Sequence, residues 1–396
     1  MGEEMTKEKQ FIIRVLSDYI LKKKTENTPD LDWEKVLEIS KIHQISGIVY
    51  SQCKEFISKA YSFEFLKAYA YCVHAYENRI NLLSSLTRRF EQSNIAYIII
   101  KGTEVAPYYP CPQLRTMGDT DIVVKSEQRA AAGEIMLSEG FVNESDYDNK
   151  EWVYVNEKLK FELHDSLIYD EIINDSKHEE YFGDFWRYVE GNKLDWNYHF
   201  LFLILHLRKH FMNSGVGFRQ FMDIAVLAKY NEELDWALIE QKLGELGLLD
   251  FAKMCLSFCE KWFGVSSPLG ECETDEDFYE QSTEIIFSNG IFGFDNEANF
   301  KNDALNHLRQ ENGSFFTMVG IALSKAFPPY RMMILEKHYA FLKGKPFLLP
   351  IAWIYRFFRG IKYKKVGQEK KRVFNDSFVS KEFIEQRTQL LEKWGL

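Results

Sequence analysis

Asp119 and Asp121 stand two residues apart at the start of a β-branched run, residues 122–124. Side chains alternate between the two faces of a strand, so both carboxylates would project from the same face. Two neighbouring carboxylates repel each other unless a cation lies between them. Mg²⁺, or Mn²⁺ in its place, suits the pair because it prefers oxygen ligands and also binds phosphate. The pair therefore predicts a divalent metal site for phosphate chemistry; the competing interpretation is a solvated strand end.

A third carboxylate and a histidine share one face of a second expected strand, residues 159–164. In the sequence FELH at positions 161–164, the polar side chains alternate with apolar ones. If this strand lies beside the one that carries Asp119, Glu162 completes a cluster of three carboxylates. His164 would then be placed to orient an acceptor, although a Glu beside a His can also be an ordinary surface pair.

The segment Lys101-Gly102-Thr103 lies where an apolar strand is expected to turn into a helix. Glycine allows a ligand to approach the backbone closely. The threonine hydroxyl and the N–H groups of a helix start can hold phosphate oxygens. Lys101 and Arg115 would add positive charge. These residues predict a phosphate-binding turn beside the carboxylates.

Alternating strands and helices are predicted around these residues, between positions 94 and 175. Residues 95–100 and 120–124 are apolar and rich in strand-forming types. The other expected elements are a short helix over 103–109, a helix over 126–138 and a hairpin of 152–155 with 159–164. The order β-α-β-α-β-β predicts a small α/β core with a mixed sheet.

Helical periodicity dominates the rest of the chain. Asp32 is a predicted N-cap, and apolar residues from Leu66 to Phe90 recur at three- and four-residue steps. This stripe predicts a long helix packed on the neighbouring core in preference to a coiled coil. Further helices are expected over 196–211, 218–230, 236–246 and 251–263, and the acidic stretch 271–284 is interpreted as a solvated linker or loop.

The predicted fold class is therefore α+β, with a small mixed-sheet core between N- and C-terminal helical regions. The expected parts are a helical region over 1–93, the core over 94–175, a helical domain over 176–265, an acidic linker with helices over 266–330, and a C-terminal helical segment with a basic run over 331–396.

His199, His206 and His210 lie on one face of an expected helix. His206 and His210 have the i, i+4 spacing of metal ligands, so a histidine metal centre is one hypothesis. No Glu stands between them as in zinc peptidases, and no Cys is near. Histidines satisfied at a helix–helix contact are therefore the favoured interpretation.

A cleft above the core is a further hypothesis for this helical domain. Lys209, His210 and Arg219 would bind phosphate there. Asp223 would orient an acceptor or pair with Arg219.

The composition is that of a folded, acidic protein. The chain has 396 residues, 46% of them hydrophobic, and a formal net charge of −10. These values exclude global disorder and argue against broad, nonspecific nucleic-acid binding. The six cysteines form no CxxC pair, the start is charged, and no run reaches the ~20 apolar residues that cross a bilayer. A cytoplasmic protein without a secretory signal or a transmembrane span is expected.

Residues 347–372 combine an apolar stretch with a basic run. Within 356–372, eight residues are basic and one is acidic. Such a segment can lie on an anionic membrane surface as a peripheral contact, or hold nucleic acid. A packed C-terminal helix with a solvated basic end is the favoured interpretation.

The order of these motifs resembles the polymerase β nucleotidyltransferase superfamily: a strand ending in Gly-Thr, a helix, Asp-x-Asp on the next strand, and a later lone acid. The wider string is similar to that of the bacterial nucleotidyltransferase family proteins. The similar segments are KG at 101–102, YY at 108–109, LR at 114–115, GDTDIVV at 118–124, FELH at 161–164, HLRKH at 206–210, FR at 218–219, Asp223, FPPY at 327–330, LLP at 348–350 and Trp353.

The resemblance implies Mg²⁺-dependent transfer of a nucleoside monophosphate from an NTP to an acceptor hydroxyl. Asp119 and Asp121 would hold one metal ion, and with Glu162 a second, although Glu162 could serve as a base instead. The acceptor is left open between a small molecule, a sugar, a protein and an RNA end. The competing hypotheses are a non-catalytic nucleotide- or ligand-binding protein that retains the fold, and a histidine metalloenzyme centred on His206 and His210.

Overall fold

The computed structural model describes residues 5–145, 152–157, 159–168, 176–213, 216–270, 272–289, 330, 341–342, 345–362 and 389–396. These residues belong to two compact units. The first comprises 1–211, 215–293 and 393–396, and it contains every candidate site residue named above. The second comprises 212–214 and 294–392.

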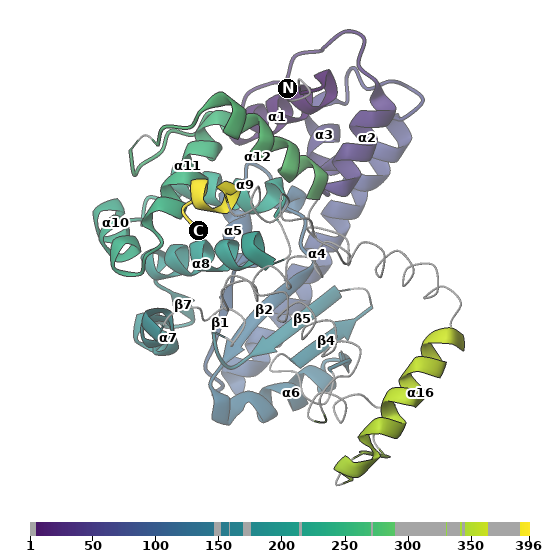
Figure 1. Cartoon of the computed structure of the whole chain (residues 1–396), viewed down its shortest axis with the longest axis vertical. Coiled ribbons are helices and arrows are strands. Elements are labelled where there is room, and N and C mark those ends of the chain that lie inside the picture. The colour runs from purple at the N-terminus through teal and green to yellow at the C-terminus, as the bar shows by residue number, and fades with distance from the viewer. Residues whose placement is uncertain are drawn as a thin grey trace. The chain divides into compact units, whose positions relative to one another are not determined.

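A five-stranded mixed sheet forms the centre of the first unit (Figure 1). Its strands are β1 (Tyr97–Ile100), β2 (Asp119–Val124), β3 (Val142–Asn143), β4 (Trp152–Asn156) and β5 (Leu159–His164). They are ordered β1-β2-β5-β4-β3; β2 and β5 are parallel, and the other neighbours are antiparallel. The predicted α+β class is confirmed. The sheet also includes β3, whose two residues are too few to show an alternating pattern.

The connection from β1 to β2 is more broken than predicted. A single short helix was expected over 103–109. The structure instead has α5 (Gly102–Val105), followed by the 3-10 turns η1 (Ala106–Tyr108) and η2 (Pro112–Leu114). Pro107 contributes to this break because proline lacks the N–H that an α-helix would bond to the carbonyl four residues earlier.

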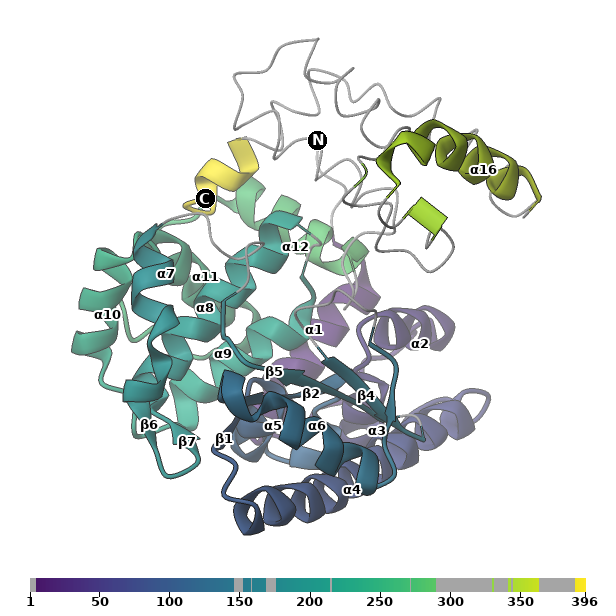
Figure 2. The same ribbon diagram turned by 90° about the horizontal axis from the view of Figure 1, so that it is seen from below.

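One face of the sheet packs on α4 (Ser62–Gln92) and α6 (Arg129–Ser138), with α4 running along this side in Figure 2. Leu83, Leu86 and Phe90 of α4 are buried in this core together with Ile122 and Phe161 of the strands. The predicted packing of the long helix on the neighbouring core is therefore correct for its second half.

The first half of α4 buries a different side from the one predicted. Leu66 belongs to the predicted stripe but is 42% exposed, whereas Phe65 is buried. This half packs against α3 (Ser46–Cys53), which the stripe alone did not locate. Which residues of α4 are buried therefore depends on the side from which α3 packs on it, and not only on the spacing of its apolar residues.

Further helices lie toward the other face of the sheet (Figures 1 and 2): α7 (Ser176–Gly183), α8 (Trp196–Asn213), α9 (Phe218–Tyr230), α10 (Trp236–Glu245) and α11 (Leu249–Phe263). Near the N-terminus, α1 (Lys7–Ile20) packs on α11, and α2 (Trp33–Ile42) begins at Asp32. Asp32 accepts hydrogen bonds from the backbone N–H groups of Glu34 and Lys35, as expected of an N-cap.

The acidic stretch 271–284, interpreted as a linker or loop, is largely helical. Helix α12 (Glu276–Asn289) begins inside it. Phe278 and Thr283 are buried, and Trp262 of α11 donates a hydrogen bond to Thr283 Oγ1 at 3.1 Å. One side of α12 is therefore packed against α11, which the acidic composition of the stretch did not indicate.

In the second unit the structure describes η6 (Pro346–Leu348) and α16 (Leu349–Lys362). Leu342 and Ala352 are buried together, and Tyr330 Oη donates to the Leu342 carbonyl oxygen at 2.9 Å. Residues 363–372 of the basic run and 327–329 of the FPPY segment lie outside the described residues. None of the helices described here is both long and apolar enough to span a bilayer.

Candidate functional site

The pairing of β2 with β5 brings the predicted carboxylates together. Asp121 stands opposite Glu162, and Asp119 stands opposite Lys160. Because side chains alternate, these residues lie on the face opposite to the core that packs on α4. The strand that carries Glu162 therefore lies beside the strand that carries Asp119, as the prediction of a carboxylate cluster required.

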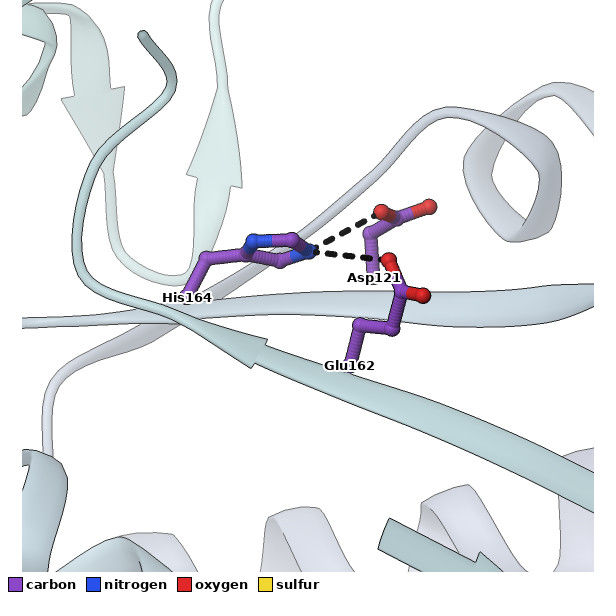
Figure 3. A group of neighbouring side chains, drawn as sticks. All are labelled: Asp121, Glu162 and His164. Atoms are coloured by element: carbon purple, nitrogen blue, oxygen red, sulfur yellow. Dashed lines mark hydrogen bonds and ion pairs between the residues drawn. The ribbon is translucent and has the colours of Figure 1, made fainter. Parts of the chain in front are cut away.

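Asp121, Glu162 and His164 form a buried cluster on that face (Figure 3). His164 Nε2 lies 3.1 Å from Asp121 Oδ1 and 3.6 Å from Glu162 Oε2. One potential ligand atom from each residue lies within 4.8 Å of the other two, so a single metal ion could contact all three. Among the described residues, this is the only such group of three or more His, Cys, Asp or Glu side chains.

Neighbouring charges outweigh burial in this cluster. Burial alone would raise the pKa of Asp121, but Lys101 and His164 hold that pKa far below its ordinary value. Lys101 Nζ lies 2.7 Å from Asp121 Oδ1. Burial alone would lower the pKa of His164, but its contacts with Asp121 and Glu162 raise it. Glu162 has a lowered pKa because His164 and Lys160 offset its burial. Both carboxylates are therefore ionised and can act as metal ligands.

Asp119 lies outside this group of three, at the half-buried first position of β2. Burial raises its pKa, and the negative charges of Asp121 and Glu162 raise it further. Within the described part of the chain its carboxylate has no hydrogen bond or ion pair. A divalent cation beside Asp119 and Asp121 would remove this repulsion.

The turn after β1 holds Lys101 in an uncommon backbone conformation. Its φ is 58° and its ψ is −128°, a combination that costs a non-glycine residue on the order of 1 kcal/mol or more. The Lys101 N–H donates to Nε2 of His199 at 2.9 Å. Its ammonium group pairs with Asp121. His199 from α8 and Asp121 from β2 therefore fix the backbone and the side chain of this turn.

Gly102 permits the close approach of Arg115. A Cβ atom at position 102 would lie 2.3 Å from Arg115 Nη1. The guanidinium pairs with Asp223 through Nε–Oδ1 at 2.9 Å and Nη2–Oδ2 at 2.6 Å. Tyr109 Oη donates to the same Oδ1 at 2.6 Å. The ion-pair partner of Asp223 is thus Arg115, and not Arg219, which the sequence had suggested as one option.

Thr103 lies at the start of α5 and is 7% exposed. Its hydroxyl donates to Met117 Sδ at 3.6 Å. Sulfur is a weak acceptor, so this contact leaves the hydroxyl available to a stronger acceptor such as a phosphate oxygen.

Arg219 brings positive charge to the site from α9. Its Nη1 donates to the Thr116 carbonyl oxygen at 3.1 Å. Burial and the nearby Arg115 lower the pKa of Arg219 to about 10, so it remains charged at neutral pH. No described Asp or Glu lies within ion-pair distance of it. A phosphate group would provide a direct ion-pair partner for this guanidinium.

Two of the histidines of α8, His206 and His210, contact each other. His210 Nε2 and His206 Nε2 are 2.9 Å apart, the distance of a hydrogen bond between the rings. Burial lowers the pKa of His210 to about 4, and the charges of Lys101, Lys209 and Arg219 act in the same direction. These three cations therefore all lie near His210. No third metal ligand joins His206 and His210 among the described residues.

Sequence reasoning did not identify Arg79 or Tyr109 as site-forming residues. Arg79 is 3% exposed. Its Nη1 donates to Thr120 Oγ1 at 2.6 Å and to the Lys160 carbonyl oxygen at 3.3 Å. A signal for Arg79 exists, because it stands four residues before Leu83 and so in phase with the buried side of α4. For Tyr109 the sequence offers only its place in the similar segment at 108–109.

Comparison with known families identifies one match. The model of a family described as "Uncharacterised nucleotidyltransferase" matches residues 29–264. The comparisons with curated proteins and with solved structures give no match. The matched range includes the whole sheet and every candidate site residue, and it confirms the resemblance on which the sequence analysis relied. Because this range is more than half of the chain, the protein belongs to this family of nucleotidyltransferases.

Proposed function

We propose that the protein is a metal-dependent nucleotidyltransferase that moves a nucleoside monophosphate from an NTP to an acceptor hydroxyl. One observation carries the proposal: the β2–β5 register sets Asp121 opposite Glu162, two residues from Asp119. These carboxylates lie beside the Lys101-Gly102-Thr103 turn, in a chain that belongs to a nucleotidyltransferase family.

Asp119, Asp121 and Glu162 are the proposed ligands of Mg²⁺ or Mn²⁺, because carboxylate oxygens suit these ions. When bound, the metal would polarise the α-phosphate and screen the charge on the entering and leaving oxygens. His164 is a weaker ligand for Mg²⁺ than a carboxylate is. We assign it as a positioning residue that holds Asp121 and Glu162 in place through its Nε2 atom.

The reaction forms a bond between the acceptor oxygen and the α-phosphorus. The bond from that phosphorus to the oxygen bridging it to the β-phosphate breaks, and pyrophosphate leaves. The acceptor proton passes to solvent, or to Glu162 if that carboxylate serves as a base instead of as a metal ligand. Thr103 and the N–H groups at the start of α5 bind phosphate oxygens, together with Arg219, which has no described Asp or Glu within ion-pair distance.

The test is calorimetric titration of each NTP, with and without Mg²⁺, into wild type and the double variant Asp119→Asn/Asp121→Asn. Asp32→Asn is the matched control, because Asn caps a helix as well as Asp does and position 32 is far from the sheet in sequence and caps α2. One NTP should bind wild type and the control only when Mg²⁺ is present, and the double variant should lose this binding. Equal binding by the folded double variant would overturn the proposed site.

Turnover separates an enzyme from a binding protein with the same site. With the NTP that binds, α-labelled nucleotide should yield pyrophosphate and a labelled product when acceptor classes are supplied. Binding that depends on Mg²⁺ but gives no turnover with any acceptor class would favour the binding protein. Tightly bound zinc that disappears in His206→Ala/His210→Ala would favour the histidine centre.

A further inference from the structure

A cavity of about 420 Å³ lies between α3 and α4, at the end of the sheet where β2 and β5 begin. Gly118, which immediately precedes Asp119, lines it, as does Leu159, the first residue of β5. The cavity therefore adjoins the strand ends next to Asp119, one of the candidate metal ligands. Its volume is in the range of small-molecule sites, about 300–1,000 Å³.

The segment 115–118 separates this cavity from the phosphate-binding turn. All four of its residues line the cavity. On the turn side, Arg115 approaches Gly102, and Met117 Sδ accepts a hydrogen bond from Thr103. The turn and the cavity thus lie on two sides of the segment that leads into Asp119.

The cavity wall combines aromatic, small and cationic residues. Tyr71 and Tyr76 supply aromatic surface, and Tyr71 is 62% exposed. The small residues Gly47 of α3 and Ala75 of α4 also line it. The charged lining residues are Lys41, Arg79 and Arg115, and no acidic residue is among them.

The cations of this wall differ in how far their charge is already balanced. Arg115 is paired with Asp223. Arg79 donates only to uncharged oxygens, those of Thr120, Lys160 and Met117, so it makes no direct ion pair with a described carboxylate. Such a wall fits a flat apolar ring that carries a negatively charged group.

We propose that this cavity binds the acceptor, and that the acceptor is a small, hydroxyl-bearing ring compound with an anionic group. The inference rests on the proposed function. In-line displacement puts the entering and leaving oxygens on opposite sides of the α-phosphorus. The proposed function puts pyrophosphate on the side of the Gly102-Thr103 turn, so the acceptor enters from the side of the cavity, past Gly118, which lines the cavity and precedes Asp119.

Phenyl phosphate is the first probe because it combines a ring with an anion. Phenol supplies the ring alone and inorganic phosphate the anion alone. Ligand-observed NMR titrations in EDTA, without NTP, keep the carboxylate site out of the measurement. Phenyl phosphate should bind more tightly than either part. Binding no tighter than that of inorganic phosphate would overturn the proposed ligand class.

Variants locate the binding. Ala75→Trp fills the cavity and should abolish phenyl phosphate binding. Tyr71→Ala should weaken it about two- to tenfold through lost aromatic contact, and Lys41→Glu should weaken it severalfold. Tyr71 and Lys41 are exposed, so these two variants keep the test informative if Ala75→Trp does not fold. Lys59→Glu is the control, since Lys59 is exposed and does not line the cavity.

Titration of the NTP with Mg²⁺ then distinguishes an acceptor pocket from a nucleoside pocket. Folded Ala75→Trp, or Tyr71→Ala in its place, should bind the NTP as wild type does. Loss of NTP binding would mean that the cavity holds the nucleoside, and would overturn the acceptor assignment. If wild type binds no NTP, the proposed function fails by its own test. The phenyl phosphate series still reports on the cavity in that case, so the two failures are distinguishable.

Discussion

Replacing Gly102 with alanine should destabilise the protein through Arg115. Gly102 does not have a positive φ, so alanine meets no backbone strain and the cost is steric. The added Cβ would lie 2.3 Å from Arg115 Nη1, whereas ordinary contacts begin at 3.4 Å, so the guanidinium must move by about 1 Å. A movement of that size misaligns the planar pair with Asp223. Because breaking a buried ion pair costs about 3–5 kcal/mol, partial loss should lower the unfolding free energy by about 2–4 kcal/mol.

Urea unfolding of Gly102→Ala and Gly118→Ala measures this effect with a matched control. A Cβ at position 118 meets no atom within 4 Å, so that variant should be neutral or gain about 0.4–1 kcal/mol. In an Arg115→Ala background there is no guanidinium for the added Cβ to clash with. Gly102→Ala should then leave the unfolding free energy almost unchanged. Equal losses at positions 102 and 118, or a loss that persists without Arg115, would refute the assigned contact.

Three other buried polar groups give predictions of their own. Burial lowers the pKa of His43 from 6.5 to about 4, so the stability that the neutral ring contributes is complete above pH 6.5 and is lost as the pH falls toward 4. Between pH 7 and pH 5, urea unfolding of wild type should lose about 2 kcal/mol more than that of His43→Gln, and equal losses would contradict this pKa. His199→Phe leaves the Lys101 N–H without its acceptor. It should lower the unfolding free energy, measured in urea, by about 1–3 kcal/mol and weaken Mg²⁺-dependent NTP binding. If neither value changes, His199 does not position the turn. Arg79→Met removes the donor that joins β2 to β5 and should cost about 2–4 kcal/mol by the same method, whereas Arg88→Met, at an exposed position of the same helix, should change little.

Local periodicity was sufficient to predict the strands and helices that it specifies strongly. The alternation in FELH identified β5, and the three- and four-residue steps identified α4. Periodicity did not fix the phase of α4, because α3 and the sheet cover two different sides of that helix. It also missed α12, whose acidic composition obscured the few residues, such as Phe278, that its packing requires.

The candidate site likewise combines features that local sequence predicts with contacts that it does not predict. A strand places Asp119 and Asp121 on one face whatever surrounds it, so their shared orientation could be predicted from two residues. The ion pair of Arg115 with Asp223 joins residues that are 108 positions apart. The hydrogen bond from Lys101 to His199 spans 98 positions. Such partners depend on how α8 and α9 pack against the sheet, which no local pattern encodes.

Helix α4 connects these parts physically. Its second half packs under the sheet that carries the carboxylates. Arg79, near its middle, bridges Thr120 of β2 and the Lys160 carbonyl of β5, next to the pairs that set Asp121 opposite Glu162. Its first half forms a wall of the cavity. Nucleotidyl transfer requires reacting groups to be held to within about 0.5 Å, which rigid elements achieve better than loops. One continuous helix that supports the carboxylate strands and lines the cavity meets that requirement, because the strands cannot shift along the helix without breaking the hydrogen bonds of Arg79.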